Sequence, residues 1–308
     1  MAVTNEFCWS KTRDENFRDC LRKYFFHYYG AWGGWEPSAA PRTRQLYILK
    51  NLQPRMIWAR GHVAHAIRAI LAEQRAGGAP AMVDAATEKM LEAMRREFRD
   101  SLARRYQQFP RKVCGLFEHE YELKISNEQW KETADHAVHC LQTFLNSDIY
   151  GKLKSATTKA WLEQENPASF TLDGIKVYVQ LDFAQRTTDS ITLYNWKTGQ
   201  TEDTNAELRL VCYTLYAGER WKVSPEQVSV SEFNLATGAV ITRNTAAADL
   251  EVMKDYIRDS ADEMSFLLED VKHNQPQPET AFDFAEDRTA CYHCNFLKIC
   301  PRWIEEQR

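Results

Sequence analysis

SFTLDGIKVYVQLDFAQRTTDSITLYNWKTGQ, residues 169–200, is the most strand-rich segment of this chain and sets its fold class. A turn signal stands at Asp173-Gly174, and two β-rich runs follow, separated by a polar turn from Thr187 to Ser190. Short runs rich in β-branched and aromatic residues, bounded by turn residues, are typical of strands joined by hairpins. The segment therefore predicts a β-meander.

The segments on either side of these strands show helical spacing. Apolar residues recur at intervals of three and four residues, which predicts helices over 55–75, 82–108 and 127–148. After the strands we expect, in order, a helix over 205–220, strands over 226–243, a long helix over 247–272 and a proline-punctuated loop over 274–278. The first half is therefore mainly helical, and the second half mixes helices with strands.

Composition and charge are those of a globular chain. The 308 residues, of which 44% are hydrophobic and 12% aromatic, suffice for a real core. No stretch approaches the roughly 18 apolar residues of a membrane span, and residues 1–15 lack the apolar region of a signal peptide. We expect a cytoplasmic protein with no membrane partner. The net charge of −4 gives no global basic footprint for nucleic acid, so such binding depends on local basic segments, such as 95–112.

Three cysteines near the C-terminal end form a C-x2-C-x5-C run, CYHCNFLKIC, at Cys291, Cys294 and Cys300. The spacing suits a compact metal site, because a tetrahedral zinc or a cubane iron–sulfur cluster takes four thiolates. The fourth ligand must lie elsewhere. Cys20 is the best candidate, since basic and aromatic residues surround it, and Cys8 is its rival. Such a site would pin the two ends of the chain together.

The strand-rich segment carries a second constellation. Asp182 lies at the end of one expected strand and Lys197 lies on the next, so that both side chains meet at one end of a sheet. A carboxylate holds Mg²⁺ or Mn²⁺, which activates water and neutralises phosphate charge, and a lysine stabilises the transition state. The pair is weak by itself. The cysteine run strengthens the case that the pair serves phosphodiester hydrolysis.

Taken together, these motifs resemble the PD-(D/E)XK nuclease superfamily, and within it the RecB-like branch with a C-terminal iron–sulfur cluster. Relatives of that branch include the CRISPR-adaptation exonucleases and AddB-type nuclease domains. The resemblance runs over nearly the whole chain and is carried by FCWSKTRDENFRDCLRKYFFHYYG (7–30), GHVAH (61–65), KVYVQLDFA (176–184), NWKTG (195–199) and the C-terminal cysteine run. The opening segment matches the family's start, which favours Cys20 over Cys8 as the first cluster ligand.

The resemblance implies an α/β fold, with a restriction-endonuclease-like core whose central mixed sheet is flanked by helices. The chain would form a single nuclease-like domain over 1–308, with the catalytic sheet core over 160–245 and a helical insertion over 80–150. Residues 285–308 would close onto Cys20 through a [4Fe-4S] cluster, with zinc as the alternative metal.

The resemblance also implies roles at the site. His65, in the family's G-x-x-x-H motif, and Asp182 would hold Mg²⁺ or Mn²⁺, and His62 could replace His65. Lys197, in the segment usually written D-x-K-T-G, would support the transition state. The substrate would be DNA, as single strands or duplex ends, and the activity that of an exonuclease.

The chain departs from the family pattern at two places. The second metal carboxylate, two residues before the lysine, is Asn195, whose amide oxygen can touch a cation but brings no negative charge. A family glutamine, four residues before a tyrosine in the following helix, aligns on Arg209, and the tyrosine aligns on Tyr213. We assign Arg209 and Tyr213 to nucleic-acid binding, with simple exposure as the alternative for the arginine.

Three explanations compete for Asn195. In the first, the chain is a noncatalytic pseudonuclease, a DNA-binding or complex-forming subunit that accompanies a helicase or a defence complex. In the second, a migrated carboxylate replaces the missing one, and Glu165 is the first choice. In the third, Asn195 is an introduced inactivating change in a natural DWKTG segment. The expected function is a metal-dependent DNA nuclease whose present activity is left open; a zinc-stabilised protein with no nucleic-acid role is supported only by the acidic pI.

Overall fold

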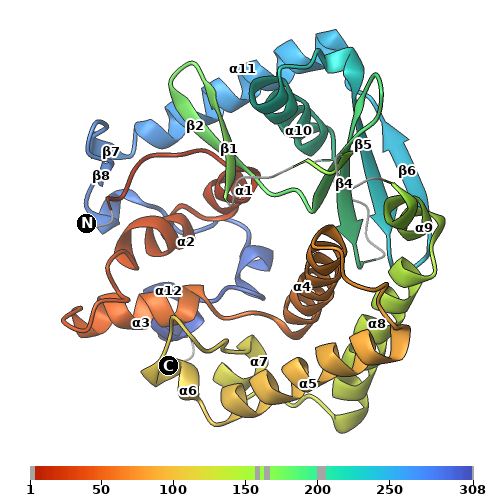
Figure 1. The fold of residues 1–308 in the computed structure, drawn as a ribbon. Coiled ribbons are helices and arrows are strands. Elements are labelled where there is room, and N and C mark those ends of the chain that lie inside the picture. Colours follow the sequence, from red (N-terminus) through yellow and green to blue (C-terminus); the bar gives the residue numbers. More distant parts are fainter. Residues whose placement is uncertain (1–3, 157–159, 163–166, 200–205, 307–308) are drawn as a thin grey trace.

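A computed structural model describes residues 4–156, 160–162, 167–199 and 206–306, drawn in Figure 1. The helices are α1 (Lys11–Asp19), α2 (Leu21–Phe25), α3 (Pro41–Lys50), α4 (Arg55–Arg75), α5 (Val83–Leu102), α6 (Arg105–Gln108), α7 (Phe117–Glu120), α8 (Asn127–Leu145), α9 (Asp148–Ser155), α10 (Ala206–Trp221), α11 (Ala247–Ser265) and α12 (Pro301–Glu306). Short helical turns are η1 (Phe26–Gly30), η3 (Pro225–Gln227), η4 (Glu279–Ala281), η5 (Arg288–Cys291) and η6 (Leu297–Ile299).

The strands are β1 (Ala168–Leu172), β2 (Ile175–Val179), β3 (Phe183–Arg186), β4 (Ile191–Lys197), β5 (Val228–Asn234), β6 (Val240–Arg243), β7 (Leu268–Asp270) and β8 (Gln275–Pro276). The central sheet has the order β3-β4-β5-β6. β4 pairs antiparallel with β3 and parallel with β5, and β6 runs antiparallel to β5. Helix α10 makes the crossover that a parallel pair requires. The expected α/β fold with a central mixed sheet is confirmed.

The expected continuous meander is wrong in one respect, because β1 and β2 form a separate two-stranded sheet. Asp173 and Gly174 close this hairpin with φ of 48° and 86°, the geometry that a two-residue turn favours. The N-terminal segment covers the free edge of β2. The amide N of Trp9 donates to the Lys176 carbonyl, and the amide N of Tyr178 donates to the Trp9 carbonyl, both at 2.8 Å. Trp9 thus takes the place beside β2 that β3 would occupy in a meander.

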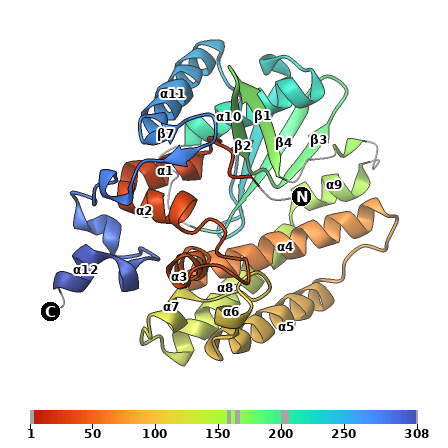
Figure 2. The same ribbon diagram turned by 90° about the vertical axis from the view of Figure 1, so that its left-hand side faces the viewer.

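Two hydrophobic cores lie on the two faces of the sheet. On one face, Leu193 and Val230 pack with residues of α10 and α11 and with β1 and β2. On the other, Trp196 and Phe233 pack with residues of α4 and α8. Figures 1 and 2 show the same layering, with α10 and α11 on one side of the strands and α4, α5 and α8 on the other. The arrangement follows from the alternation of buried side chains along β4 and β5.

The expected helices agree with the structure except near two ends. The helix expected over 82–108 is interrupted at Arg104, whose φ of 54° is left-handed and ends α5 before α6 begins. The helix expected over 247–272 ends at Ser265, because buried Leu268 pairs with Pro276 in a small antiparallel sheet instead of continuing the helix. The prediction that 80–150 is an insertion stays a prediction. Among the described residues, no helix combines the length and the apolar character that a membrane crossing needs.

Candidate active site and cysteine-lined cavity

Asp182 lies in the main-chain connection that leads directly into β3. Its amide N donates to the Tyr194 carbonyl at 3.1 Å, and its Oδ2 accepts from the amide N of Trp196 at 2.8 Å. These two bonds fix the carboxylate beside Asn195 on the neighbouring strand β4. Removal from water raises the pKa of Asp182, against the opposing effects of the Trp196 N–H and of nearby Arg60, Arg68 and Arg209. The site therefore holds a carboxylate in a strongly basic setting.

Glu232 is the acidic residue on the other side of Asn195. The parallel pairing of β4 and β5 aligns Asn195 with Glu232, and Asn195 Nδ2 donates to Glu232 Oε1 at 3.2 Å. Asn195 is 3% exposed, so its amide depends on this partner for a hydrogen bond. Asp182, Asn195 and Glu232 thus lie in a row across three neighbouring chain segments, with the amide in the middle.

Lys197 and Arg209 converge on the same carboxylate oxygen. Lys197 is the last residue of β4 and places Nζ 3.3 Å from Glu232 Oε1, while Arg209 on α10 places Nη1 at 3.2 Å. The side chains of Lys197, Arg209 and Glu232 are each about one-fifth exposed. Sequence reasoning missed Glu232. The signal for it was a single acidic residue in the otherwise alternating strand VSVSEFN, 228–234, but nothing local links it to Asn195.

Helix α4 carries the predicted ligand His65 and two arginines that act on Asp182. Arg60 and Arg68, both exposed, act on the charge of Asp182, and His65 lies between them on the same helix and is also exposed. His62, the alternative to His65, is engaged instead with Glu97 Oε2 at 3.0 Å. Glu165 lies outside the described residues. Within the described segments, no three His, Cys, Asp or Glu side chains gather closely enough to hold an ion.

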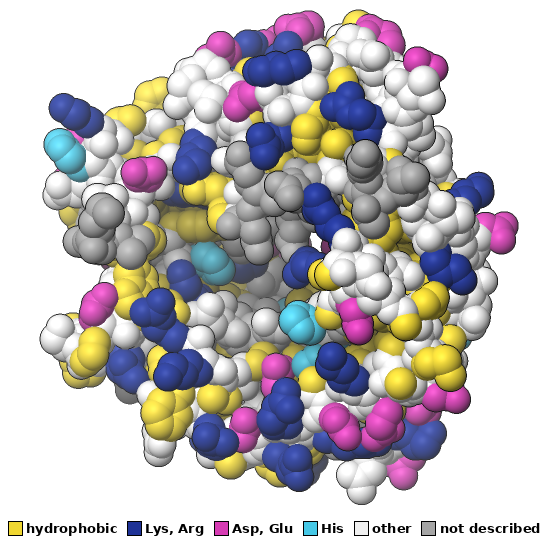
Figure 3. Space-filling model, in the orientation of Figure 1, with side chains coloured by type: hydrophobic (Ala, Val, Ile, Leu, Met, Phe, Trp, Pro, Cys, Tyr) yellow, Lys and Arg dark blue, Asp and Glu magenta, His cyan; other side chains and the backbone are white. Residues whose placement is uncertain are grey.

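Tyr213 is buried beneath the site. It is 2% exposed, and its hydroxyl donates to the carbonyl of Gln180, two residues before Asp182. This bond supports the main chain that carries Asp182. A contact between Tyr213 and nucleic acid stays a prediction. On the surface, Figure 3 shows a hollow near the middle of one face, with Lys and Arg side chains around it.

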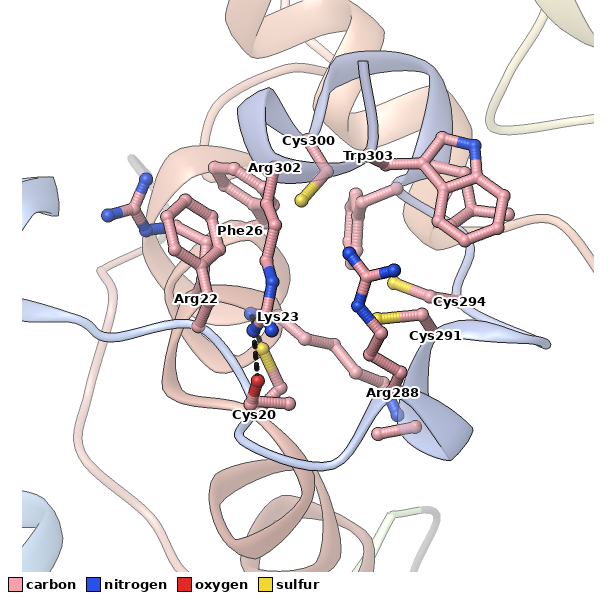
Figure 4. A pocket seen from close by; sticks show the side chains of 15 residues that line it. Cys20, Arg22, Lys23, Phe26, Arg288, Cys291, Cys294, Cys300, Arg302 and Trp303 are labelled. Carbon is pink, nitrogen blue, oxygen red and sulfur yellow. Dashed lines mark hydrogen bonds between the residues drawn. The ribbon is translucent and has the colours of Figure 1, made fainter. Parts of the chain in front are cut away.

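The four predicted cluster cysteines line one cavity that is partly open to solvent. Figure 4 shows the sulfur atoms of Cys20, Cys291, Cys294 and Cys300 pointing into it. Cys20 links α1 to α2, and its Sγ accepts from the amide N of Lys23 at 3.4 Å. The other three belong to the turns around η5 and η6. Cys8 is not among the lining residues, and its Sγ accepts instead from Arg13 at 3.5 Å.

The thiols of this cavity influence one another. Burial raises the pKa of Cys294 to about 11, and nearby Cys20 and Cys300 add to the rise. The pKa of Cys291 is raised for the same reasons. Four cationic side chains also line the cavity: Arg22, Lys23, Arg288 and Arg302. Such surroundings suit a group that carries negative charge when four thiolates bind it.

Comparisons with known proteins give one match, to a family model. No curated protein matches the chain. The family model of the PD-(D/E)XK nuclease superfamily matches residues 8–301, nearly the whole chain, and that range includes both the Asp182–Lys197 region and the four cysteines. The chain therefore belongs to the PD-(D/E)XK nuclease superfamily.

Proposed function

We propose that this protein is a metal-dependent DNA nuclease that acts as an exonuclease on single strands or duplex ends. The observation that carries the proposal is the placement of the Asp182 carboxylate beside Asn195 of β4, in surroundings rich in arginine, with Lys197 two residues further along the same strand. A carboxylate that holds a divalent metal and a lysine close to it suit the hydrolysis of a phosphodiester. A cytoplasmic location, where thiols stay reduced, belongs to the same proposal.

The donors present fit Mg²⁺ or Mn²⁺. These hard cations prefer carboxylate and amide oxygens, and one or two carboxylates from the protein suffice when substrate phosphate completes the shell. Asp182 and Asn195 would hold the ion, with His65 reaching in from α4, and Glu165 would be a further candidate. The bound ion would supply activation of water and neutralisation of phosphate charge. Asp182 is held for this purpose by the amide N of Trp196.

The basic residues would act on the DNA backbone. Lys197 stands beside Asn195 on β4, where its ammonium group can stabilise the charge that develops on the reacting phosphate. Arg60 and Arg68 are exposed on α4 near Asp182 and can neutralise phosphates on either side of the cleaved bond. Arg209 would add a phosphate contact from α10.

A second part of the proposal assigns a [4Fe-4S] cluster to Cys20, Cys291, Cys294 and Cys300, as in the RecB-like branch. The shared cavity supports it, because four cysteines from both ends of the chain line one space and their sulfur atoms point into it. Zinc is the alternative. The thiols would lose their protons on binding, and the cationic side chains around them would offset the resulting charge.

Asn195 supports one alternative, a noncatalytic DNA-binding or complex-forming subunit of a helicase or defence assembly. An amide brings no negative charge where a carboxylate would strengthen metal binding. In that case the basic surface would still bind DNA, and the binding would not depend on divalent metal.

The test is anaerobic cleavage of end-labelled single- and double-stranded DNA with Mn²⁺ and with Mg²⁺. The protein is compared with Lys197→Ala, with Asn195→Asp and with a control, Lys254→Ala, whose lysine pairs with Glu251 on α11. Cleavage by the protein and the control, lost in Lys197→Ala, supports the nuclease. Cleavage by Asn195→Asp alone means that Asn195 is the residue that inactivates the site. If neither the protein nor any variant cleaves DNA, the result favours the noncatalytic subunit over the nuclease.

A further inference from the structure

The unexpected residue at the site is Glu232, because a partly buried carboxylate in a core strand needs a reason to be there. The strand VSVSEFN otherwise alternates apolar and small polar residues, and Val228, Val230 and Phe233 are buried. An ionised side chain in such a strand is stabilised only by the partners it meets. Those partners are Asn195, Lys197 and Arg209, all at the candidate active site.

We propose that Glu232 is the second metal-binding carboxylate of this chain, and that it supplies the negative charge that Asn195 lacks. The proposal rests on the nuclease function proposed above. Glu232 lies directly opposite Asn195 in the β4–β5 register, and its carboxylate reaches the Asn195 amide at 3.2 Å. Glu232 and Asp182 therefore flank one amide from the two neighbouring segments.

The sheet geometry supports this pairing. In β4, Asn195 and Lys197 share a face with Leu193, and in β5, Glu232 shares a face with Val230, which packs in the same core as Leu193. Neighbouring strands lie about 4.8 Å apart. A carboxylate one strand away from Asn195 can thus serve a cation that also touches the amide oxygen once the amide turns over, because Nδ2 and not Oδ1 faces Glu232 in this structure. With Glu232 as the second carboxylate, the site keeps its negative charge, which is supplied by β5 instead of β4.

Positive charge already gathers between the two carboxylates. Arg209 lies 3.2 Å from Glu232 and also acts on the charge of Asp182, and Lys197 adds a second cation at Glu232. A divalent ion would compete with Arg209 for the same carboxylate oxygens. A small pocket lined in part by Arg209, Glu232 and Arg243 adjoins this contact. We therefore expect Arg209→Gln to bind Mn²⁺ more tightly than the unchanged protein does.

The alternative role for Glu232 is purely structural, as a counter-ion that holds Lys197 and Arg209. The two roles differ in what happens to metal affinity, which is measurable without DNA. The experiment titrates Mn²⁺ into the protein by calorimetry, with free Mn²⁺ followed by electron paramagnetic resonance. The variants are Glu232→Gln, the exchange Asn195→Asp/Glu232→Gln, and a control, Glu132→Gln, on the exposed side of α8.

The proposal predicts that Glu232→Gln weakens Mn²⁺ binding by roughly tenfold or more, whereas Glu132→Gln does not change it. The exchange variant restores one carboxylate and one amide in swapped positions, so it should recover most of the affinity. This recovery also shows that loss in Glu232→Gln is not a folding defect, which thermal melting checks independently.

Two results would overturn the proposal and are distinguishable. If Glu232→Gln binds Mn²⁺ and cleaves DNA as well as the unchanged protein, Glu232 is a counter-ion and the nuclease proposal stands. If the unchanged protein binds no Mn²⁺ and cuts no DNA, the assignment of Glu232 and the metal-dependent function fail together.

Discussion

Arg22 and Glu279 form an ion pair at 3.2 Å that joins α2 to the segment before the cysteine run. The same guanidinium donates from Nε to the Phe282 carbonyl, and the amide N of Arg22 donates to the Asp283 carbonyl, both at 2.9 Å. Phe25 packs on Phe282 nearby. The N-terminal helices are therefore held to the C-terminal segment by protein contacts as well as by any metal, and the two contributions can be separated.

We expect Cys291→Ala to yield a colourless protein without iron. Because the contacts of Arg22 remain, the loss of order should be concentrated in residues 288–306, where the turns carry the cysteines. Iron and sulfide analysis, visible absorbance and amide hydrogen exchange test this. Cys8→Ser is the matched control and should keep its iron, since Cys8 does not line the cavity. A brown, iron-loaded Cys291→Ala protein would contradict the cluster assignment.

Asp182→Asn should stabilise the metal-free protein at pH 7 while abolishing cleavage. The pKa of Asp182 is raised above its ordinary value of 3.8, chiefly by removal from water. Between the ordinary and the raised value the folded state binds more protons than the unfolded state, so stability falls as pH rises through that window. Above this pH window the folded state carries the full free-energy cost of the buried charge, and below the window that cost is absent.

The measurement for this variant is urea unfolding with a chelator present, at pH 7 and at pH 4.5. The advantage of Asp182→Asn over the unchanged protein should shrink at the lower pH. Asp189→Asn, in the exposed turn between β3 and β4, is the control and should show no such advantage. A destabilised Asp182→Asn protein at pH 7 would mean that its arginine partners outweigh the burial.

Asn195→Asp by itself should destabilise the metal-free protein by about 1–3 kcal/mol, because it replaces a hydrogen-bond donor with a second carboxylate 3.2 Å from Glu232. Millimolar Mn²⁺ should recover much of this loss, since the ion neutralises the crowded charges. Thermal melting with and without Mn²⁺ measures both effects. The exchange variant Asn195→Asp/Glu232→Gln, which keeps one donor and one acceptor, should be close to the unchanged protein without metal.

Arg60→Gln and Arg68→Gln should each weaken DNA binding by up to about tenfold at low salt, and each should lower the salt dependence of binding by about one ion. Both arginines are exposed on α4 near Asp182. Fluorescence anisotropy across a salt series measures the slopes. Arg95→Gln is the control, because Arg95 pairs with Glu88 on α5. Equal slopes for all three variants would remove α4 from the DNA-binding surface.

Sequence reasoning located the site residues that lie within short motifs. Asp182 lies directly before β3 and bonds to β4, because β3 and β4 form a hairpin whose register is set locally, while its role beside Lys197 stays a prediction. The sequence did not predict a role for Glu232, because only the parallel pairing of β4 with β5 brings residue 232 to residue 195. The register between two parallel strands depends on how the crossover helix packs, so a local sequence pattern cannot predict it.

The fold errors have the same origin. Residues 175–179 have the pattern of a strand, but nothing in that pattern says that Trp9, from the far end of the chain, takes the edge of β2. Likewise, the apolar spacing over 247–272 continues past Ser265, while the pairing of Leu268 with Pro276 ends the helix. Local propensity predicted the elements, and long-range contacts determined where they stop.

The crossover through α10 also sets the order in which the site is completed during folding. The β3–β4 hairpin can form from neighbouring residues, but β5 docks beside β4 only after the whole of α10 has crossed the sheet. Parallel pairing over such a separation is intrinsically slow. We expect a late stage of folding in which Asn195 and Lys197 are already aligned on β4 while Glu232 has not yet joined them, so that this group of residues is completed only when β5 docks.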